Sequence, residues 1–120
     1  MKLLNRSAFS VLPRQPFVDW VSRLPQDDEA LNQAMTLDEH RQEGTVYLID
    51  EVEAEDAFLQ AIKAHWSAMF ENELAAWDEF EDHWPCERDQ AMFQTWFELK
   101  PQVLALDLSR QPLMTAELEQ

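Results

Sequence analysis

The chain has 120 residues, a formal net charge of −15 at pH 7 and a single glycine, Gly44. Phosphate-binding loops need glycine, because only glycine lets the backbone N–H groups approach an anion closely. The lone glycine therefore excludes a P-loop, a dinucleotide-binding turn and a glycine-flanked nucleophilic serine. The acidic surface repels the phosphates of DNA and RNA, so we expect no nucleic-acid partner and no nucleotide cofactor.

No apolar run approaches the length that a membrane span requires, and the N-terminal residues are not followed by the apolar segment of a signal peptide. Cys86 is the only cysteine, so the chain cannot form an intramolecular disulfide. We therefore expect a cytoplasmic protein with no membrane partner.

The charge is distributed unevenly along the chain. Residues 1–24 carry four basic side chains and one carboxylate, whereas residues 25–56 carry eleven carboxylates and one arginine. Such asymmetry predicts two electrostatically different faces, or pairing between the ends of two copies in a homo-oligomer.

The first predicted elements are a strand at residues 8–12 and a helix at residues 16–24. Phe9 and Val11 alternate with smaller residues, which is the pattern of a half-buried strand. Four apolar residues after Pro16 then follow the spacing of one helical stripe: Phe17, Trp20, Val21 and Leu24.

An acidic stretch separates this helix from the strongest predicted strand. Thr36 and Glu39 have the spacing of a helical capping box, which predicts a short helix or turn, and residues 28–34 allow an earlier single turn. Gly44 permits a tight bend into residues 45–50, whose β-branched and aromatic side chains favour a strand.

A long helix is predicted at residues 53–77, with carboxylates in its first turn and apolar residues on successive turns. An acidic linker, residues 78–83, follows it. Apolar residues at helical spacing, Met92, Phe93, Trp96 and Phe97, predict a helix at residues 85–98. The apolar run that follows predicts a third strand at residues 103–108. Residues 109–120 carry no strong pattern, and we expect a poorly ordered C-terminal tail there.

These elements predict a single α+β domain over residues 1–108. A small three-stranded sheet, formed by residues 8–12, 45–50 and 103–108, would be covered by the three predicted helices in two layers.

The carboxylate-rich segments are candidates for a metal-dependent hydrolase. Residues 78–83 combine four carboxylates with His83, and Asp50 and Glu51 lie at the end of the strongest predicted strand. The alternative interpretations are a solvated acidic linker and a helix N-terminus whose carboxylates interact with the helix dipole. The three histidines share no ligand spacing, and the acidic neighbours of Cys86 indicate an inert thiol.

The tryptophans on either side of the acidic linker are candidates for a protein-binding site. Aromatic residues surrounded by carboxylates are typical of interaction hot spots, although a corner between two helices has the same composition. The candidate partner-binding residues are Trp77, Asp78, Glu79, Glu81, Asp82 and Trp84.

Several stretches together resemble a family of small acidic bacterial cytosolic proteins of unassigned function. The first stretch consists of residues 5–8, Pro13 and residues 16–20, and the second of residues 46–51. The third contains Phe70, Glu73, Leu74 and Trp77, and the fourth contains Met92, Phe93, Trp96 and Phe97. The resemblance covers most of residues 5–97. It implies a compact cytosolic domain, and it implies neither an activity nor any functional residue.

Three functional hypotheses follow from the sequence. The first is a non-enzymatic interaction or regulatory protein whose acidic segments, residues 27–56 and 78–83, bind a basic protein partner. The second is a small metal-dependent hydrolase that uses carboxylates near Asp50 together with the run from Asp78 to His83. The third is a self-associating structural protein, in which residues 1–24 of one copy meet the acidic face of another. None of the three requires an organic cofactor.

Overall fold

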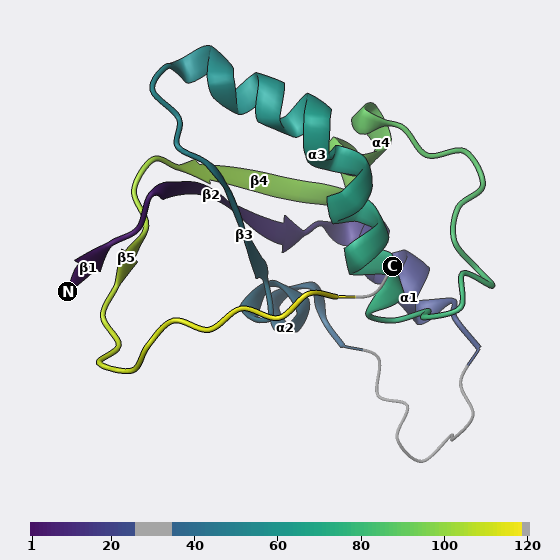
Figure 1. The fold of residues 1–120 in the computed structure, drawn as a ribbon. Helices are drawn as coiled ribbons and strands as arrows, with labels where there is room; N and C mark the ends of the chain where they lie inside the picture. Colours follow the sequence, from purple (N-terminus) through teal and green to yellow (C-terminus); the bar gives the residue numbers. More distant parts are fainter. Residues whose placement is uncertain (26–34, 119–120) are drawn as a thin grey trace.

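The computed structural model describes residues 1–25 and 35–118, and within these residues it forms a mixed α+β fold (Figure 1). The elements in chain order are β1 (Lys2–Leu3), β2 (Arg6–Pro13), α1 (Gln15–Ser22), α2 (Leu37–Gln42), β3 (Thr45–Asp50), α3 (Glu55–Ala75), α4 (Gln90–Trp96), β4 (Phe97–Gln102) and β5 (Leu106–Asp107). The turn predicted at residues 28–34 lies outside the described residues.

The main sheet has three antiparallel strands in the order β3-β2-β4. The central strand β2 pairs with both neighbours, so that Phe9 lies opposite Tyr47 on one side and Pro101 on the other. Phe9 and Val11 of β2 are fully buried. The apolar side chains of the first predicted strand thus lie at the centre of the sheet. A separate pair of short strands, β1 and β5, brings the N-terminal residues beside Leu106 and Asp107.

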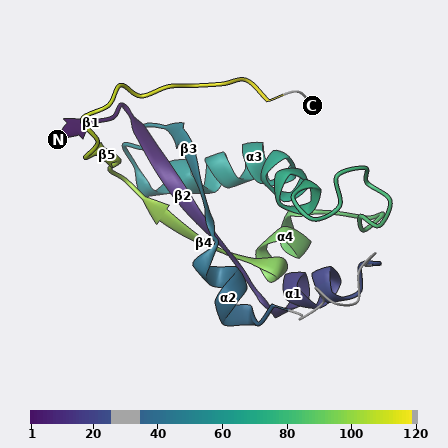
Figure 2. The ribbon, with the colours of Figure 1, turned by 90° about the horizontal axis from the view of Figure 1, so that it is seen from below.

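Helix α3 covers one face of the main sheet, and α1, α2 and α4 gather at the end of the sheet where β2 finishes (Figures 1 and 2). The core lies between them and is dominated by aromatic rings. Phe70 of α3 is fully buried, and its ring centroid lies 5.4 Å from that of Phe93 and 5.9 Å from that of Phe97.

In the part of the chain that the structure describes, no helix is both long and apolar enough to cross a membrane.

The fold confirms the α+β class and several of the predicted elements. Residues 8–12 and 45–50 are strands, and the first and longest predicted helices correspond to α1 and α3. The capping box before α2 is also present, because the Thr36 hydroxyl accepts a hydrogen bond from Glu39 N, and the Glu39 carboxylate accepts one from Thr36 N.

The last two predicted elements were wrong in their boundaries. The helix predicted at residues 85–98 comprises only Gln90–Trp96, because the Asp89 carboxylate caps its N-terminus by accepting a hydrogen bond from Met92 N at 2.7 Å. The chain becomes extended at Phe97, and the third strand of the sheet is β4 at Phe97–Gln102.

The strand predicted at residues 103–108 is therefore displaced from the main sheet. Only Leu106 and Asp107 are in a strand there, and they pair with β1. The sequence prediction assigned residues 97 and 98 to the preceding helix and began the strand only after Pro101. Strand β4 includes Pro101 because it is an edge strand, and an edge strand tolerates a residue that has no N–H group.

Residues 108–118 contain neither helix nor strand, and the segment runs along the outside of the molecule (Figures 1 and 2). Its apolar side chains Leu113 and Met114 are 64% and 87% exposed. The predicted division into a domain that ends at residue 108 and a poorly ordered tail stays a prediction.

Candidate functional site

The acidic loop, residues 78–83, is held at both ends by hydrogen bonds. At its start Asp78 N donates to Leu74 O, and the Asp78 carboxylate accepts a 2.6 Å hydrogen bond from His83 N. At its end the indole of Trp20 donates to His83 O at 3.0 Å. Glu81, between them, has a φ of 65°, in the left-handed region that favours glycine. The loop therefore has a defined turn with fixed ends.

Two of the six predicted partner-binding residues have structural roles in this loop. The Trp84 indole donates a 2.8 Å hydrogen bond to Asp78 O, and the half-buried Trp84 ring packs against the core. The Arg88 guanidinium lies 5.4 Å from the centre of that ring. Asp78 and Trp84 thus hold the loop in shape, which is the helix-corner interpretation of this sequence.

The other four residues face solvent, together with a neighbour that the sequence reasoning missed. Glu79, Glu81 and Asp82 are exposed, and Trp77 is 43% exposed. Phe80 is 79% exposed in the middle of the carboxylates. An aromatic residue inside an acidic loop, with no helical or strand periodicity around it, was the signal that could have identified Phe80.

Trp77 also forms one wall of a polar hollow of about 470 Å³, which we call the Trp77 pocket. The pocket lies between α2, the start of β3 and the last turns of α3. Its polar and aromatic lining consists of Phe17, His40, Glu43, Thr45, Asn72, Glu73 and Trp77.

Glu73 is the most deeply set carboxylate of the Trp77 pocket. The Tyr47 hydroxyl donates a 2.5 Å hydrogen bond to Glu73 Oε2, and Thr45 Oγ1 lies 3.4 Å from Glu73 Oε1. Asn72 Nδ2 in turn donates to the Tyr47 oxygen at 2.8 Å. Thr45 and Tyr47 are two residues apart on β3, so both side chains point toward α3.

Burial changes the proton affinity of this pair. It raises the pKa of Glu73, and the hydrogen bonds from Tyr47 and Thr45 offset part of that rise. Burial also raises the pKa of Tyr47, and the negative charge of Glu73 adds to the effect. Tyr47 therefore stays protonated and donates to the carboxylate over the physiological pH range.

His40 forms the back of the Trp77 pocket. It is 4% exposed, and its ring centroid lies 5.2 Å from that of Trp77 and 6.0 Å from that of Phe17. Burial lowers the pKa of His40, although the nearby carboxylates of Glu43 and Glu39 act in the opposite direction. A neutral imidazole packed on the Trp77 ring keeps the indole in place.

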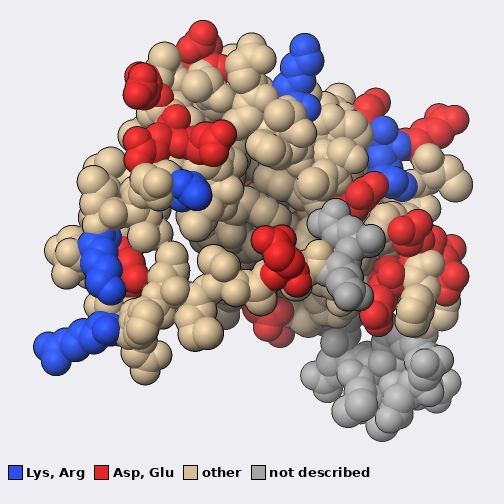
Figure 3. Space-filling view, in the orientation of Figure 1, with Lys and Arg blue, Asp and Glu red and all other residues tan. Residues whose placement is uncertain are grey.

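The carboxylates of the pocket have no basic counterpart. In residues 1–25 and 35–118 the lysines and arginines form two ion pairs, Arg41–Glu98 and Arg88–Glu71, so neither Glu43 nor Glu73 pairs with a lysine or arginine. Acidic side chains gather over the loop between α3 and α4 and over the start of α3, whereas basic side chains are scattered over this face, some of them near the β1–β5 pair (Figure 3). Glu43 and Glu73 thus give the pocket an acidic lining.

The two carboxylate segments proposed for a hydrolase do not meet. Asp50 ends β3 just before α3 begins, whereas His83 follows the end of α3. Helix α3 has 21 residues, which corresponds to a length of about 30 Å. Among the described residues, no group of three or more His, Cys, Asp or Glu side chains is arranged to hold a metal ion.

Comparisons of the sequence with known protein families and with curated proteins, and of the fold with solved structures, found no match. The resemblance to a bacterial family therefore stays a prediction from the sequence. What defines this molecule is its α+β fold and the geometry of its surface.

Proposed function

We propose that this protein is a non-enzymatic binding protein, and that the Trp77 pocket receives a lysine or arginine side chain of a basic protein partner. The observation that carries the proposal is the combination of a partly exposed indole with two carboxylates in one pocket whose lining includes no lysine or arginine. The metal-dependent hydrolase and the self-associating protein stay predictions from the sequence.

The Trp77 ring supplies an attractive surface for a cation. Positive groups bind the face of an indole through its quadrupole, with about 0.5–2 kcal/mol depending on how far water is removed. The His40 ring packs on Trp77 and restricts its movement. A partner that binds this ring therefore loses little side-chain entropy in the protein.

Glu73 and Glu43 supply the charge. Burial disfavours the ionised form of Glu73, as the direction of its pKa shift indicates, so an arriving ammonium or guanidinium group would stabilise the carboxylate. Binding would release the proton that Glu73 carries at low pH. The affinity for a cation should therefore increase as the pH rises through the pKa of Glu73.

The acidic loop beside the pocket suits a partner with several positive charges. Glu79, Glu81 and Asp82 are exposed on this loop, and Phe80 offers an apolar contact among them. Complementary charges of this kind accelerate association, whereas the aromatic residues contribute more to the lifetime of the complex. We therefore include Glu79, Phe80, Glu81 and Asp82 in the proposed interface.

Calorimetric titration with a short oligolysine peptide tests the proposal. The peptide should bind the native protein, and Glu73→Gln and Trp77→Ala should each weaken binding by about tenfold or more. Glu53→Gln is the matched control, because it removes the same charge from an exposed site near the start of α3.

Two results would overturn the pocket assignment. One is an equal loss of affinity in Glu73→Gln and Glu53→Gln, which would show that only the net charge attracts the peptide. The other is unchanged affinity in Trp77→Ala while the variant keeps the unfolding temperature of the native protein. A Trp77→Phe variant should retain part of the affinity, because it keeps an aromatic face.

A further inference from the structure

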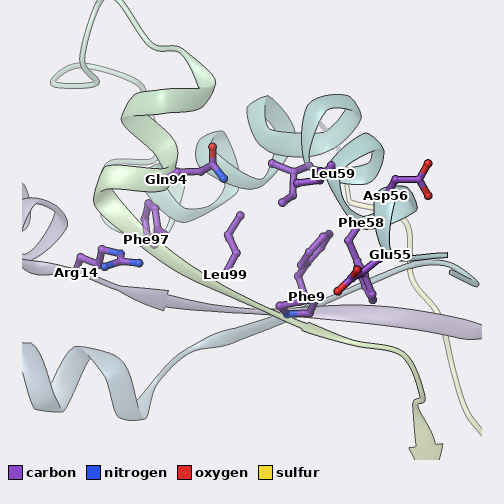
Figure 4. Close-up of a pocket in the computed structure, with 11 residues that line it drawn as sticks. Phe9, Arg14, Glu55, Asp56, Phe58, Leu59, Gln94, Phe97 and Leu99 are labelled. Atoms are coloured by element: carbon purple, nitrogen blue, oxygen red, sulfur yellow. The ribbon is translucent and has the colours of Figure 1, made fainter.

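A second hollow lies on the helix-covered side of the sheet, between α3 and the edge strand β4. It is a groove of about 790 Å³ between the first half of α3, α4 and strand β4 (Figure 4). Its apolar lining, which defines what we call the apolar groove, consists of Phe9, Phe58, Leu59, Ile62, Phe97, Leu99 and Pro101. The groove shares no residue with the Trp77 pocket.

The floor of the groove is rigid, and its rim is accessible. Phe9 is fully buried in the central strand, and its ring stacks edge-on with that of Phe58 at 5.6 Å. Leu59, on the α3 wall, is 65% exposed. Leu99 projects from β4 into the space between these residues (Figure 4). A volume of this size, lined mainly by apolar side chains, is typical of small-molecule sites.

One end of the groove presents two hydrogen-bond donors. The Arg14 side chain points from the end of β2 toward Leu99, and the Gln94 amide projects into the same end from α4 (Figure 4). The backbone of Arg14 is fixed, because Arg14 N donates to Trp96 O at 2.8 Å. Within the described residues the Arg14 guanidinium makes no side-chain hydrogen bond or ion pair, and the Gln94 N–H groups are not used.

The opposite end of the groove is acidic. Glu55 and Asp56 from the first turn of α3 lie there, on the far side of Leu99 from Arg14 (Figure 4). A guanidinium and an amide at one end attract an anionic head group. The carboxylates at the other end repel it, so an anionic ligand has one favoured orientation.

We propose that the apolar groove binds a small monocarboxylate with a linear apolar chain. The carboxylate accepts hydrogen bonds from Arg14 and Gln94, and the chain lies over the half-buried side chains of Leu99 and Phe58, against Leu59. This site is separate from the proposed function, because it uses different residues and takes a ligand of opposite charge. The charge order along the groove sets it apart from an unspecific apolar patch.

Calorimetric titration with decanoate, at concentrations below micelle formation, tests the proposal on the full chain. Decanol has the same chain without the charge and is the matched ligand. Decanoate should bind with one-to-one stoichiometry and about tenfold more tightly than decanol. The variant Arg14→Gln should reduce this preference to near unity, whereas Arg23→Gln, which changes an exposed arginine after α1, should leave it unchanged.

A second variant tests the apolar part of the groove. Leu59→Gln changes an exposed helical residue, so the fold should persist, and it should weaken decanoate and decanol by similar factors. Equal affinity for the two ligands in the native protein would overturn the proposal. So would a preference for decanoate that survives Arg14→Gln, or the absence of saturable binding.

Discussion

The two ends of α3 support surfaces of opposite character. At its N-terminal half, Phe58, Leu59 and Ile62 face the apolar groove, which ends at the Arg14 guanidinium. At its C-terminal end, Glu73 and Trp77 face a polar pocket whose charge is negative. One helix thus serves both regions because its neighbours differ: the first half lies beside the edge strand β4, and the last turns lie over the polar start of β3. The aromatic core therefore fixes the position of α3, whereas the side chains at each end decide what the surface can bind.

The largest expected effect comes from removing the packing that both regions share. Phe70→Ala should lower the free energy of unfolding by about 3–5 kcal/mol, because Phe70 is fully buried against Phe93, Trp96 and Phe97. Denaturant unfolding measures it. If the comparison is right, the variant weakens peptide binding and decanoate binding together. Loss of only one would show that the two ends do not depend on the same core.

Much of this core could be predicted from the sequence, and the two binding surfaces could not. The apolar stripes of α1 and α3 and the alternation around Phe9 follow directly from side-chain periodicity. The Tyr47–Glu73 hydrogen bond joins residues 26 positions apart, so no local spacing indicates it. The groove was missed for the same reason. In addition, the third strand was predicted at residues 103–108, whereas the strand that lines the groove is β4, Phe97–Gln102. Trp77, Glu79, Glu81 and Asp82 are exposed, whereas Asp78 and Trp84 take part in hydrogen bonds within the loop that no sequence pattern indicated.

A smaller effect, confined to the polar end, comes from removing the Tyr47 hydroxyl. Tyr47→Phe should lower the free energy of unfolding by about 1–3 kcal/mol, because the half-buried Glu73 carboxylate and the Asn72 amide each lose a hydrogen-bond partner. Thermal unfolding measures it. Decanoate affinity should stay at the native value. A change in decanoate affinity would contradict the independence of the two regions.

The stability of the polar region at the C-terminal end of α3 should depend on pH through Glu73. Because burial raises the pKa of Glu73 above its ordinary value of 4.5, the folded state holds this proton more tightly than the unfolded state. The contribution of Glu73 to stability is therefore fully present below pH 4.5 and is lost as the pH rises through the folded-state pKa. Denaturant unfolding at several pH values should show that Glu73→Gln gains stability relative to the native protein as the pH rises. A constant difference between the two proteins would contradict the assigned shift.

The smallest expected effect on stability is at the tip of the acidic loop. Phe80→Ala should change the free energy of unfolding by no more than about 0.5 kcal/mol, because Phe80 is 79% exposed. The same variant should weaken oligolysine binding, and calorimetry measures that loss. Trp84→Ala gives the contrast, since its indole holds the loop through Asp78 O. A large loss of stability in Phe80→Ala would mean that Phe80 is a packing residue and not part of the proposed interface.

The most direct test of the central claim is a nuclear magnetic resonance titration of the tryptophan indole N–H groups with oligolysine. The Trp77→Phe variant assigns the Trp77 signal. This signal should shift with the peptide concentration, whereas the signals of the half-buried Trp66 and Trp96, which belong to the core, should stay in place. The shift should require at least about tenfold more peptide in Glu73→Gln and should keep its native concentration dependence in Glu53→Gln. An unmoved Trp77 signal under conditions where calorimetry detects binding would contradict the claim that this pocket receives the cationic side chain.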